Sequence, residues 1–145
     1  EDDSMNTLLI CDSEQALTDE LAEWFCSRGW HVSVASTVEG ARKIMSERGY
    51  PDVLLVEQKL PVLDGTKLAS MMLASDQVAR PCIIALMGSD SFGPEISERH
   101  PCDIWLSKPF SPRSACDRFE FAMRRSPICA ARRRSQNLSG SRVDC

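Results

Sequence analysis

Residues 51–57 read PDVLLVE, a run in which four consecutive apolar residues precede a glutamate. Such a run is typical of a central parallel strand that is buried on both faces of its sheet. Four other stretches have strand-like patterns, at 8–11, 31–35, 82–87 and 104–106. The sequence therefore predicts five strands, with residues 53–56 among the most deeply buried.

The segments between these strands have the apolar spacing of helices, at about 13–28, 37–49, 66–75 and 111–125. Gly29 and Gly49 are expected to end the first two helices, and Thr37 can cap the second. Residues 89–101 contain a Gly-Pro pair at 93–94, so only a turn or two of helix is expected there, after Pro94.

Strands that alternate with helices pair in parallel through right-handed crossovers, so we expect a doubly wound α/β sheet with helices on both faces. In such sheets, ligands bind beyond the carboxyl ends of the strands. The residues at those ends therefore form the candidate site. They are Asp12, Ser13 and Glu14 after the first strand, Glu57 at the end of the third, Met87 and Gly88 at the end of the fourth, and Lys108 and Pro109 after the fifth.

Five short motifs resemble those of the receiver domains of bacterial response regulators and hybrid histidine kinases. They are LLICDSE at 8–14, PDVLLVE at 51–57, LPVLDG at 60–65, IIALMG at 83–88 and LSKP at 106–109. Their spacing is similar too: 45 residues separate Asp12 from Glu57, 30 separate Glu57 from Met87, and 21 separate Met87 from Lys108. The resemblance covers residues 6 to 125. It implies a flavodoxin-like (CheY-like) five-stranded parallel sheet with strand order 2-1-3-4-5.

The resemblance also implies a chemistry of which this sequence keeps only part. In a working receiver, two adjacent acids hold Mg²⁺ together with an aspartate that accepts the phosphoryl group. Here Asp12 matches the first acid, Ser13 stands at the second, and Glu57 stands at the accepting position. Met87 replaces the hydroxyl residue that bonds the phosphoryl group, and a thioether cannot donate that bond. We therefore expect phosphotransfer to be lost, and Mg²⁺ to bind weakly through Asp12 and Glu57, with Glu14 within reach, or not at all.

Other positions keep the family pattern. Lys108 and Pro109 resemble the pocket lysine and the cis-proline turn that follows it. Lys108 can pair with Glu57, whose longer carboxylate could imitate a phosphoaspartate. Trp105 stands at the aromatic switch position, where partner contact and edge packing both remain open. Met87, the other switch position, is expected to pack in the core, and the pair of Asp12 with Lys108 could be purely structural.

Three functions from different classes fit these residues. The first is a pseudo-receiver that is not phosphorylated and regulates a histidine kinase or an output domain by contact, or pairs with a second copy. The second is an atypical phosphoacceptor in a phosphorelay that uses Glu57 and Mg²⁺. The third is an unrelated flavodoxin-like binding module, which the lack of a Gly- or Ser/Thr-rich loop after the first strand disfavours. None makes the domain an enzyme, although a full-length parent could be a hybrid histidine kinase.

Composition sets the remaining limits. A net charge of -4 argues against a nucleic-acid-binding domain. No apolar run is long enough to cross a membrane, and the acidic start is unlike a signal peptide. The seven cysteines form no CxxC pair, which argues against zinc and favours a reducing, cytoplasmic setting.

The domain boundaries follow from the same patterns. We expect an N-terminal extension over 1–6, a receiver-like domain over 7–126, and a tail over 127–145. The tail is rich in Arg and Ser, so it is interpreted as a disordered basic tail, a linker or a cloning remnant.

Overall fold

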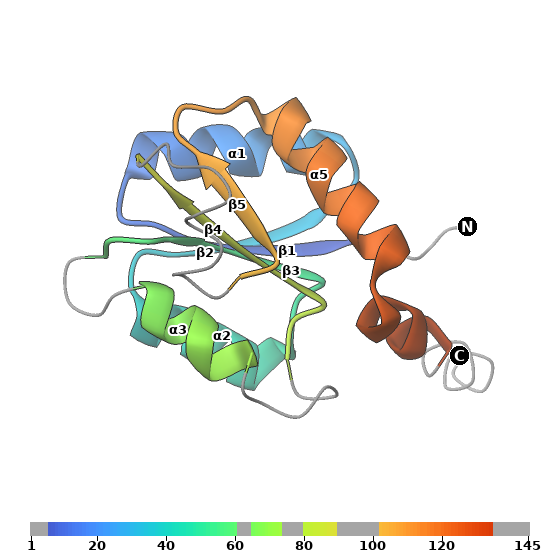
Figure 1. Ribbon diagram of the computed structural model, residues 1–145. Helices are drawn as coiled ribbons and strands as arrows, with labels where there is room; N and C mark the ends of the chain where they lie inside the picture. Colours follow the sequence, from blue (N-terminus) through green and yellow to red (C-terminus); the bar gives the residue numbers. More distant parts are fainter. Residues whose placement is uncertain (1–5, 61–64, 74–79, 90–101, 135–145) are drawn as a thin grey trace.

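The computed structural model describes residues 6–60, 65–73, 80–89 and 102–134. Five parallel strands form one sheet in the order β2-β1-β3-β4-β5, as expected for this doubly wound fold (Figure 1). The strands are β1 (Thr7–Cys11), β2 (His31–Ala35), β3 (Val53–Glu57), β4 (Ile83–Gly88) and β5 (Ile104–Ser107). The helices are α1 (Gln15–Ser27), α2 (Val38–Arg48), α3 (Gly65–Leu73) and α5 (Pro112–Arg125).

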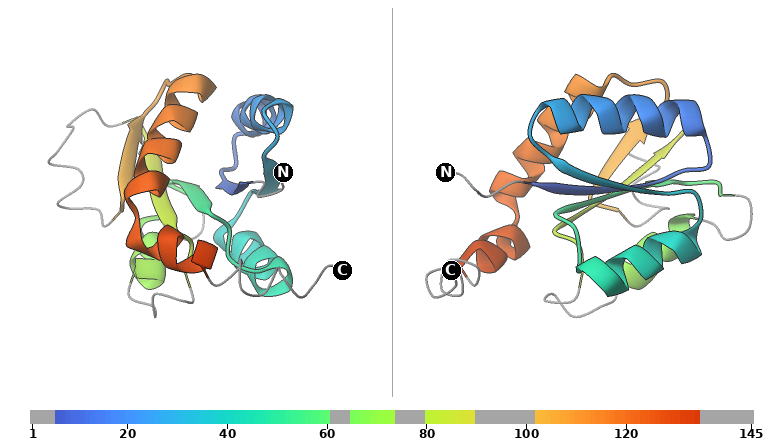
Figure 2. Two further views of the ribbon diagram at one scale, coloured as in Figure 1. Left: turned by 90° about the vertical axis from the view of Figure 1, so that its right-hand side faces the viewer. Right: turned by 180° about the vertical axis from the view of Figure 1, so that it is seen from behind.

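The sheet lies between two helical layers. Helices α1 and α5 cover one face, and α2 and α3 cover the other (Figures 1 and 2). Because successive side chains on a strand point to opposite faces, β1 contributes to two cores. Leu8 and Ile10 pack in the core under α1 and α5, whereas Leu9 and Cys11 pack in the core under α2 and α3. The apolar runs of the sequence are thus buried on both faces, as predicted.

The predicted helix ends are confirmed where the sequence marked them. The Thr37 hydroxyl accepts a hydrogen bond from the Gly40 backbone N–H at 3.0 Å and caps α2. Gly29 and Gly49 have φ angles of 88° and 92°, which glycine adopts without a steric penalty. The short helix expected after Pro94 lies outside the described residues.

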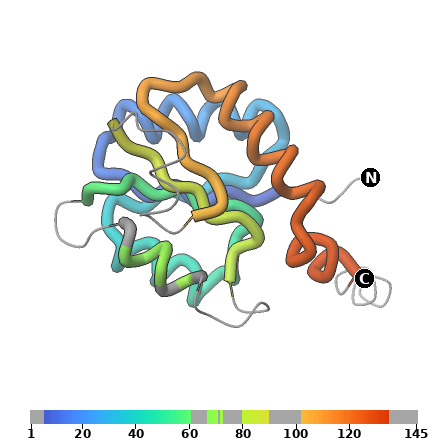
Figure 3. The backbone as a smooth tube through the Cα atoms, viewed as in Figure 1, coloured from blue at the N-terminus to red at the C-terminus, as the bar shows by residue number. Residues whose placement is uncertain are grey.

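The expected disordered tail is wrong for its first part, because residues 127–134 are helical. The chain leaves α5 and turns directly into this segment, which we call the C-terminal helix (Figure 3). Its first turn is capped, since the Ser126 hydroxyl accepts from the Cys129 N–H at 3.1 Å. Cys129 is buried in the core under α1 and α5. Burial of this apolar side and the Ser-Pro start explain why the segment folds.

No helix among the described residues is long and apolar enough to cross a membrane.

Candidate functional site

Three predicted residues meet at the carboxyl ends of the strands. Lys108 Nζ lies 2.9 Å from Asp12 Oδ2, contacts Glu57 Oε1, and lies 3.5 Å from Glu14 Oε1. Asp12 follows β1, Glu57 ends β3, and Lys108 follows β5. The rule that places ligands at this edge of a doubly wound sheet therefore points to a cluster of one cation and three carboxylates.

The backbone holds each of these residues in place. The Asp12 N–H donates to the Ala35 carbonyl at 3.0 Å, which extends the pairing of β1 with β2. The Lys108 N–H donates to the Gly88 carbonyl at 2.7 Å, which extends the pairing of β5 with β4. The peptide bond between Lys108 and Pro109 is cis, as the resemblance implied. Strand pairing thus places Lys108 beside the two carboxylates.

The cluster is largely shielded from water. The exposed side-chain fractions are 3% for Asp12, 12% for Glu57 and 18% for Lys108. Burial alone would lower the pKa of Lys108, but its hydrogen bonds to Glu57 and Asp12 outweigh that effect and raise the pKa. Lys108 is therefore a cation at neutral pH, and it offsets part of the charge of its two carboxylate partners.

All four carboxylate oxygens of Asp12 and Glu57 already have partners. Beyond the contacts to Lys108, Asp12 Oδ1 accepts from the Glu14 N–H at 3.0 Å, and Glu57 Oε2 accepts from the Lys59 N–H at 3.0 Å. Ser13, which stands where the family has its second acid, is exposed. Within the described residues no group of three or more His, Cys, Asp or Glu is arranged to hold a metal ion. Mg²⁺ is usually held by one or two carboxylates together with water, so it would have to compete here with Lys108 and the backbone N–H groups for the oxygens of Asp12 and Glu57.

The two predicted switch positions lie on opposite faces of the sheet. Met87 pairs in register with Glu57, is fully buried, and packs under α1 and α5. Trp105 is 6% exposed and packs in the core under α2 and α3. Its indole N–H donates to the Ser107 hydroxyl at 3.0 Å. Of the two readings left open for Trp105, the structure favours packing.

Gly88 is a site residue whose role the sequence analysis did not identify. A Cβ atom built at Gly88 would lie 2.8 Å from Trp105 Cη2 and 3.0 Å from Gln58 Oε1. Real side chains do not approach so closely, so the Trp105 ring requires a glycine beneath it. A glycine at the end of an otherwise apolar strand is the signal for such a close approach.

The chain is similar to bacterial regulators over most of its length. No family model matches it. It is 28% identical over 123 residues to PhoP, the alkaline phosphatase synthesis transcriptional regulatory protein of Bacillus subtilis, a match that covers 85% of this chain and 50% of PhoP. It is 31% identical over 126 residues to the transcriptional regulatory protein TrcR of Mycobacterium tuberculosis, which covers 86% and 48%. The chain thus spans about half the length of these curated relatives.

Solved receiver structures share the fold. The chemotaxis response regulator CheY4 of Vibrio cholerae matches with a TM-score of 0.71 and 16% identity, over 82% of this chain and 99% of CheY4. A two-component response regulator from Clostridium difficile matches with a TM-score of 0.72 and 20% identity, over 83% and 98%. TrrA from Thermotoga maritima, solved in complex with Mg(2+)-BeF, matches with a TM-score of 0.69 and 19% identity, over 81% and 99%.

The strand order and the solved structures show that the chain has the fold of response-regulator receiver (CheY-like) domains. In sequence it is similar to part of bacterial transcriptional regulatory proteins.

Proposed function

We propose that this receiver domain regulates a partner protein by direct contact and does not accept a phosphoryl group. The observation that carries the proposal is the state of Glu57. One of its carboxylate oxygens contacts Lys108, and the other accepts from the Lys59 N–H. A carboxylate with both oxygens engaged in this way would have to give up one of these contacts before it could attack a phosphoryl donor.

The position of the carboxylate also disfavours attack on a phosphoryl donor. Glutamate has one more methylene than aspartate, which moves its oxygens outward by about an ångström. Misplacement of a reacting group by that distance costs on the order of 100-fold in rate. Phosphoryl transfer depends almost entirely on positioning and on electrostatic stabilisation. A misplaced carboxylate therefore weakens one of the two contributions on which catalysis depends.

The surroundings of Glu57 support the same proposal. Exposed Ser13 supplies no carboxylate for a metal. Buried Met87 lies beside Glu57 in register and offers no hydrogen-bond donor to a phosphoryl oxygen. With Lys108 already paired, the groups that would stabilise a transferring phosphoryl group are either absent from this edge of the sheet or engaged.

The partner that we propose is a histidine kinase or an output domain, in the same polypeptide or another. PhoP and TrcR are transcriptional regulatory proteins about twice as long as the match, which motivates an output domain as a partner. Helix α5 presents an exposed aromatic residue for such a contact. Phe121 is 53% exposed, and the Arg125 guanidinium lies over its ring, 4.6 Å from the ring centroid.

Intact-protein mass spectrometry after incubation with acetyl phosphate and Mg²⁺ tests the proposal. We expect no phosphoryl adduct on the natural chain. The matched variant Ser13→Asp/Glu57→Asp restores the two missing family acids and should gain a Mg²⁺-dependent adduct, because Asp12 and Lys108 are already in place. An adduct on the natural chain that maps to Glu57 would overturn the proposal and establish the alternative, a phosphoacceptor that uses glutamate.

A further inference from the structure

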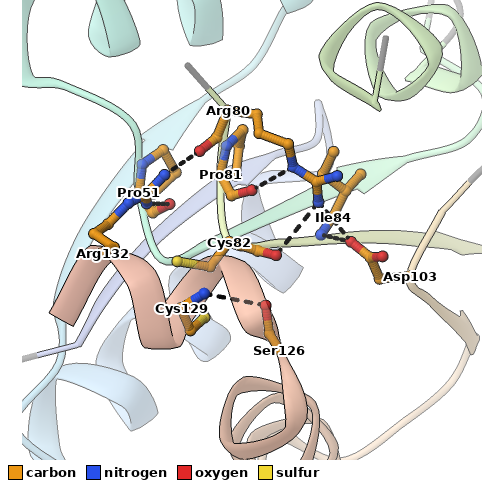
Figure 4. Close-up of polar contacts among 9 residues, drawn as sticks. All are labelled: Pro51, Arg80, Pro81, Cys82, Ile84, Asp103, Ser126, Cys129 and Arg132. Atoms are coloured by element: carbon orange, nitrogen blue, oxygen red, sulfur yellow. Dashed lines mark hydrogen bonds and ion pairs between the residues drawn. The ribbon is translucent and has the colours of Figure 1, made fainter. Parts of the chain in front are cut away.

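The amino ends of the strands, opposite the charged cluster, are closed by the C-terminal helix of residues 127–134. Arg132 binds this helix to the segments that directly precede two strands. Its guanidinium donates to the Pro51 carbonyl before β3, at 3.4 Å, and to the Arg80 carbonyl before β4 (Figure 4). Arg80 in turn pairs with Asp103 before β5, at 2.9 Å. The start of each of these strands is therefore tied into one network.

Two thiols face each other inside this network. Cys82 lies directly before β4, Cys129 lies on the C-terminal helix, and Figure 4 shows their side chains on facing sides of the junction. Both residues are buried, at 2% and 4% exposure, and both are free thiols. They come from segments far apart in the sequence, so only the packing of the C-terminal helix brings them together.

The two thiols differ in acidity. The hydrogen bond with Cys82 lowers the pKa of Cys129 to about 7, against burial, which would raise it; the Ser126 hydroxyl and Arg133 also lower it, and Asp52 raises it. The same hydrogen bond, together with burial, raises the pKa of Cys82. This asymmetry divides the pair into a thiolate that can attack and a thiol that can resolve the product.

Cys129 also lines a cavity of about 630 Å³ at this edge of the sheet. Arginines surround it: Arg48, Arg124, Arg132 and Arg133. The carboxylates in the lining are those of Asp52 and Glu120, so the cavity carries a positive balance. A small reagent that bears carboxylates would be drawn into it, because clefts lined by one sign of charge concentrate the opposite sign.

We propose that Cys82 and Cys129 form a thiol–disulfide exchange site that reacts with a small anionic disulfide and ends as an intramolecular disulfide. In the first step the Cys129 thiolate attacks one sulfur of the reagent, forms a mixed disulfide, and releases the other half as a thiolate. In the second step the Cys82 sulfur attacks the Cys129 sulfur and releases the second half of the reagent, and the Cys82 proton leaves with it or passes to solvent. The two cysteines are oxidised by two electrons, and the reagent is reduced to two thiols.

The product would join the C-terminal helix to β4 covalently. Without the bond, the helix is held by the Arg132 hydrogen bonds and by the burial of Cys129. With it, residues 127–134 could not leave the sheet while the sheet stays folded. This inference is independent of the proposed function, since it concerns the opposite edge of the sheet.

The test treats the full chain with glutathione disulfide, blocks remaining thiols with N-ethylmaleimide, and maps disulfides by mass spectrometry without reduction. We expect a Cys82–Cys129 bridge that dithiothreitol removes. The Cys82→Ser variant should stop at a single glutathione adduct on Cys129, and Cys129→Ser should form no bridge. The matched control Cys26→Ser removes an exposed thiol and should leave bridging unchanged.

The cavity is tested by the choice of reagent. Bridging by anionic glutathione disulfide should be several-fold faster than by neutral hydroxyethyl disulfide, and Arg124→Gln should reduce that preference. Adducts on Cys26 or Cys102, with Cys82 and Cys129 unmodified in the natural chain, would overturn the proposal. That outcome can be read on the natural chain, so the test does not depend on any variant folding.

Discussion

At the carboxyl edge of the sheet an ammonium group lies between two largely shielded carboxylates, whereas at the amino edge a helix is held by hydrogen bonds to main-chain carbonyls. Lys108 balances both Asp12 and Glu57, and all three side chains are at most 18% exposed. Arg132 donates to the carbonyls of Pro51 and Arg80, which carry no net charge. At the carboxyl edge the charge balance of two carboxylates thus depends on one cation, whereas at the amino edge the arginine that holds the helix binds uncharged main-chain carbonyls.

This difference predicts unequal sensitivity to substitution. A buried charge that loses its partner keeps the cost of its desolvation, and that cost is several kcal/mol for each ion. A carbonyl that loses a donor at a partly exposed helix can turn to water instead. Substitutions at the carboxyl edge should therefore lower the free energy of unfolding more than substitutions at the amino edge.

Replacing Lys108 by methionine should have the largest effect. Lys108→Met keeps most of the side-chain volume but leaves Asp12 and Glu57 side by side without a cation. We expect the free energy of unfolding, measured in urea, to fall by roughly 3–5 kcal/mol.

The control for this variant is Lys43→Met, at an exposed position of α2, which should change stability little. Adding Glu57→Gln to Lys108→Met removes one of the two unbalanced charges and should recover part of the loss. A fall of less than about 1 kcal/mol, the size typical of exposed ion pairs, would contradict this account of the carboxyl edge.

Gly88→Ala should have the next largest effect. The new Cβ would meet the Trp105 ring at 2.8 Å, so the ring must move within a packed core. Such overpacking typically costs about 1–3 kcal/mol, and tryptophan fluorescence should report the displaced ring. In the background of Trp105→Phe, which lacks the clashing Cη2 atom, the cost should be smaller. An unchanged cost in that background would place the strain against Gln58 instead.

Much of the carboxyl edge could be predicted from the sequence because its residues follow the strands directly. The apolar runs located the strands, and the ends of the runs located Asp12, Glu57 and Lys108. The contact of Lys108 with both carboxylates depends on side-chain positions that spacing does not specify. The partners of all four oxygens of Asp12 and Glu57 could likewise be seen only in three dimensions.

The helix at the amino edge is not predicted by the composition of its segment. The composition of 127–145 is polar and basic, and this outweighed a local signal at its start. Ser126-Pro127 repeats the pattern of Ser111-Pro112, which begins α5 with a serine cap and a proline in the first turn. That signal could have predicted a second helix. Its docking through Cys129 and Arg132 could not, because their partners Cys82, Pro51 and Arg80 lie far away in the sequence.

Arg132→Gln should have a smaller effect than either substitution at the carboxyl edge. It removes the charged donor to the Pro51 and Arg80 carbonyls, a loss of about 1 kcal/mol for hydrogen bonds that water can partly replace. Hydrogen exchange should quicken in residues 127–134 more than in β1 or β3. Arg134→Gln, at an exposed position of the same helix, is the matched control. Equal effects of the two variants would mean that Arg132 does not hold the helix.

The smallest effect near neutral pH should come from pH itself. The pKa of Lys108 is raised above 10.5 in the folded chain, so the lysine is charged in both the folded and the unfolded states below that pH. Its contribution to stability is then fully present below 10.5 and is lost as the pH rises through the raised value. The difference in unfolding free energy between the natural chain and Lys108→Met should therefore stay constant from about pH 7 to about pH 10 and shrink only above that range. A difference that already shrinks between about pH 7 and pH 9 would mean that burial dominates and lowers this pKa, and the carboxyl edge would then lack the cation on which its charge balance depends.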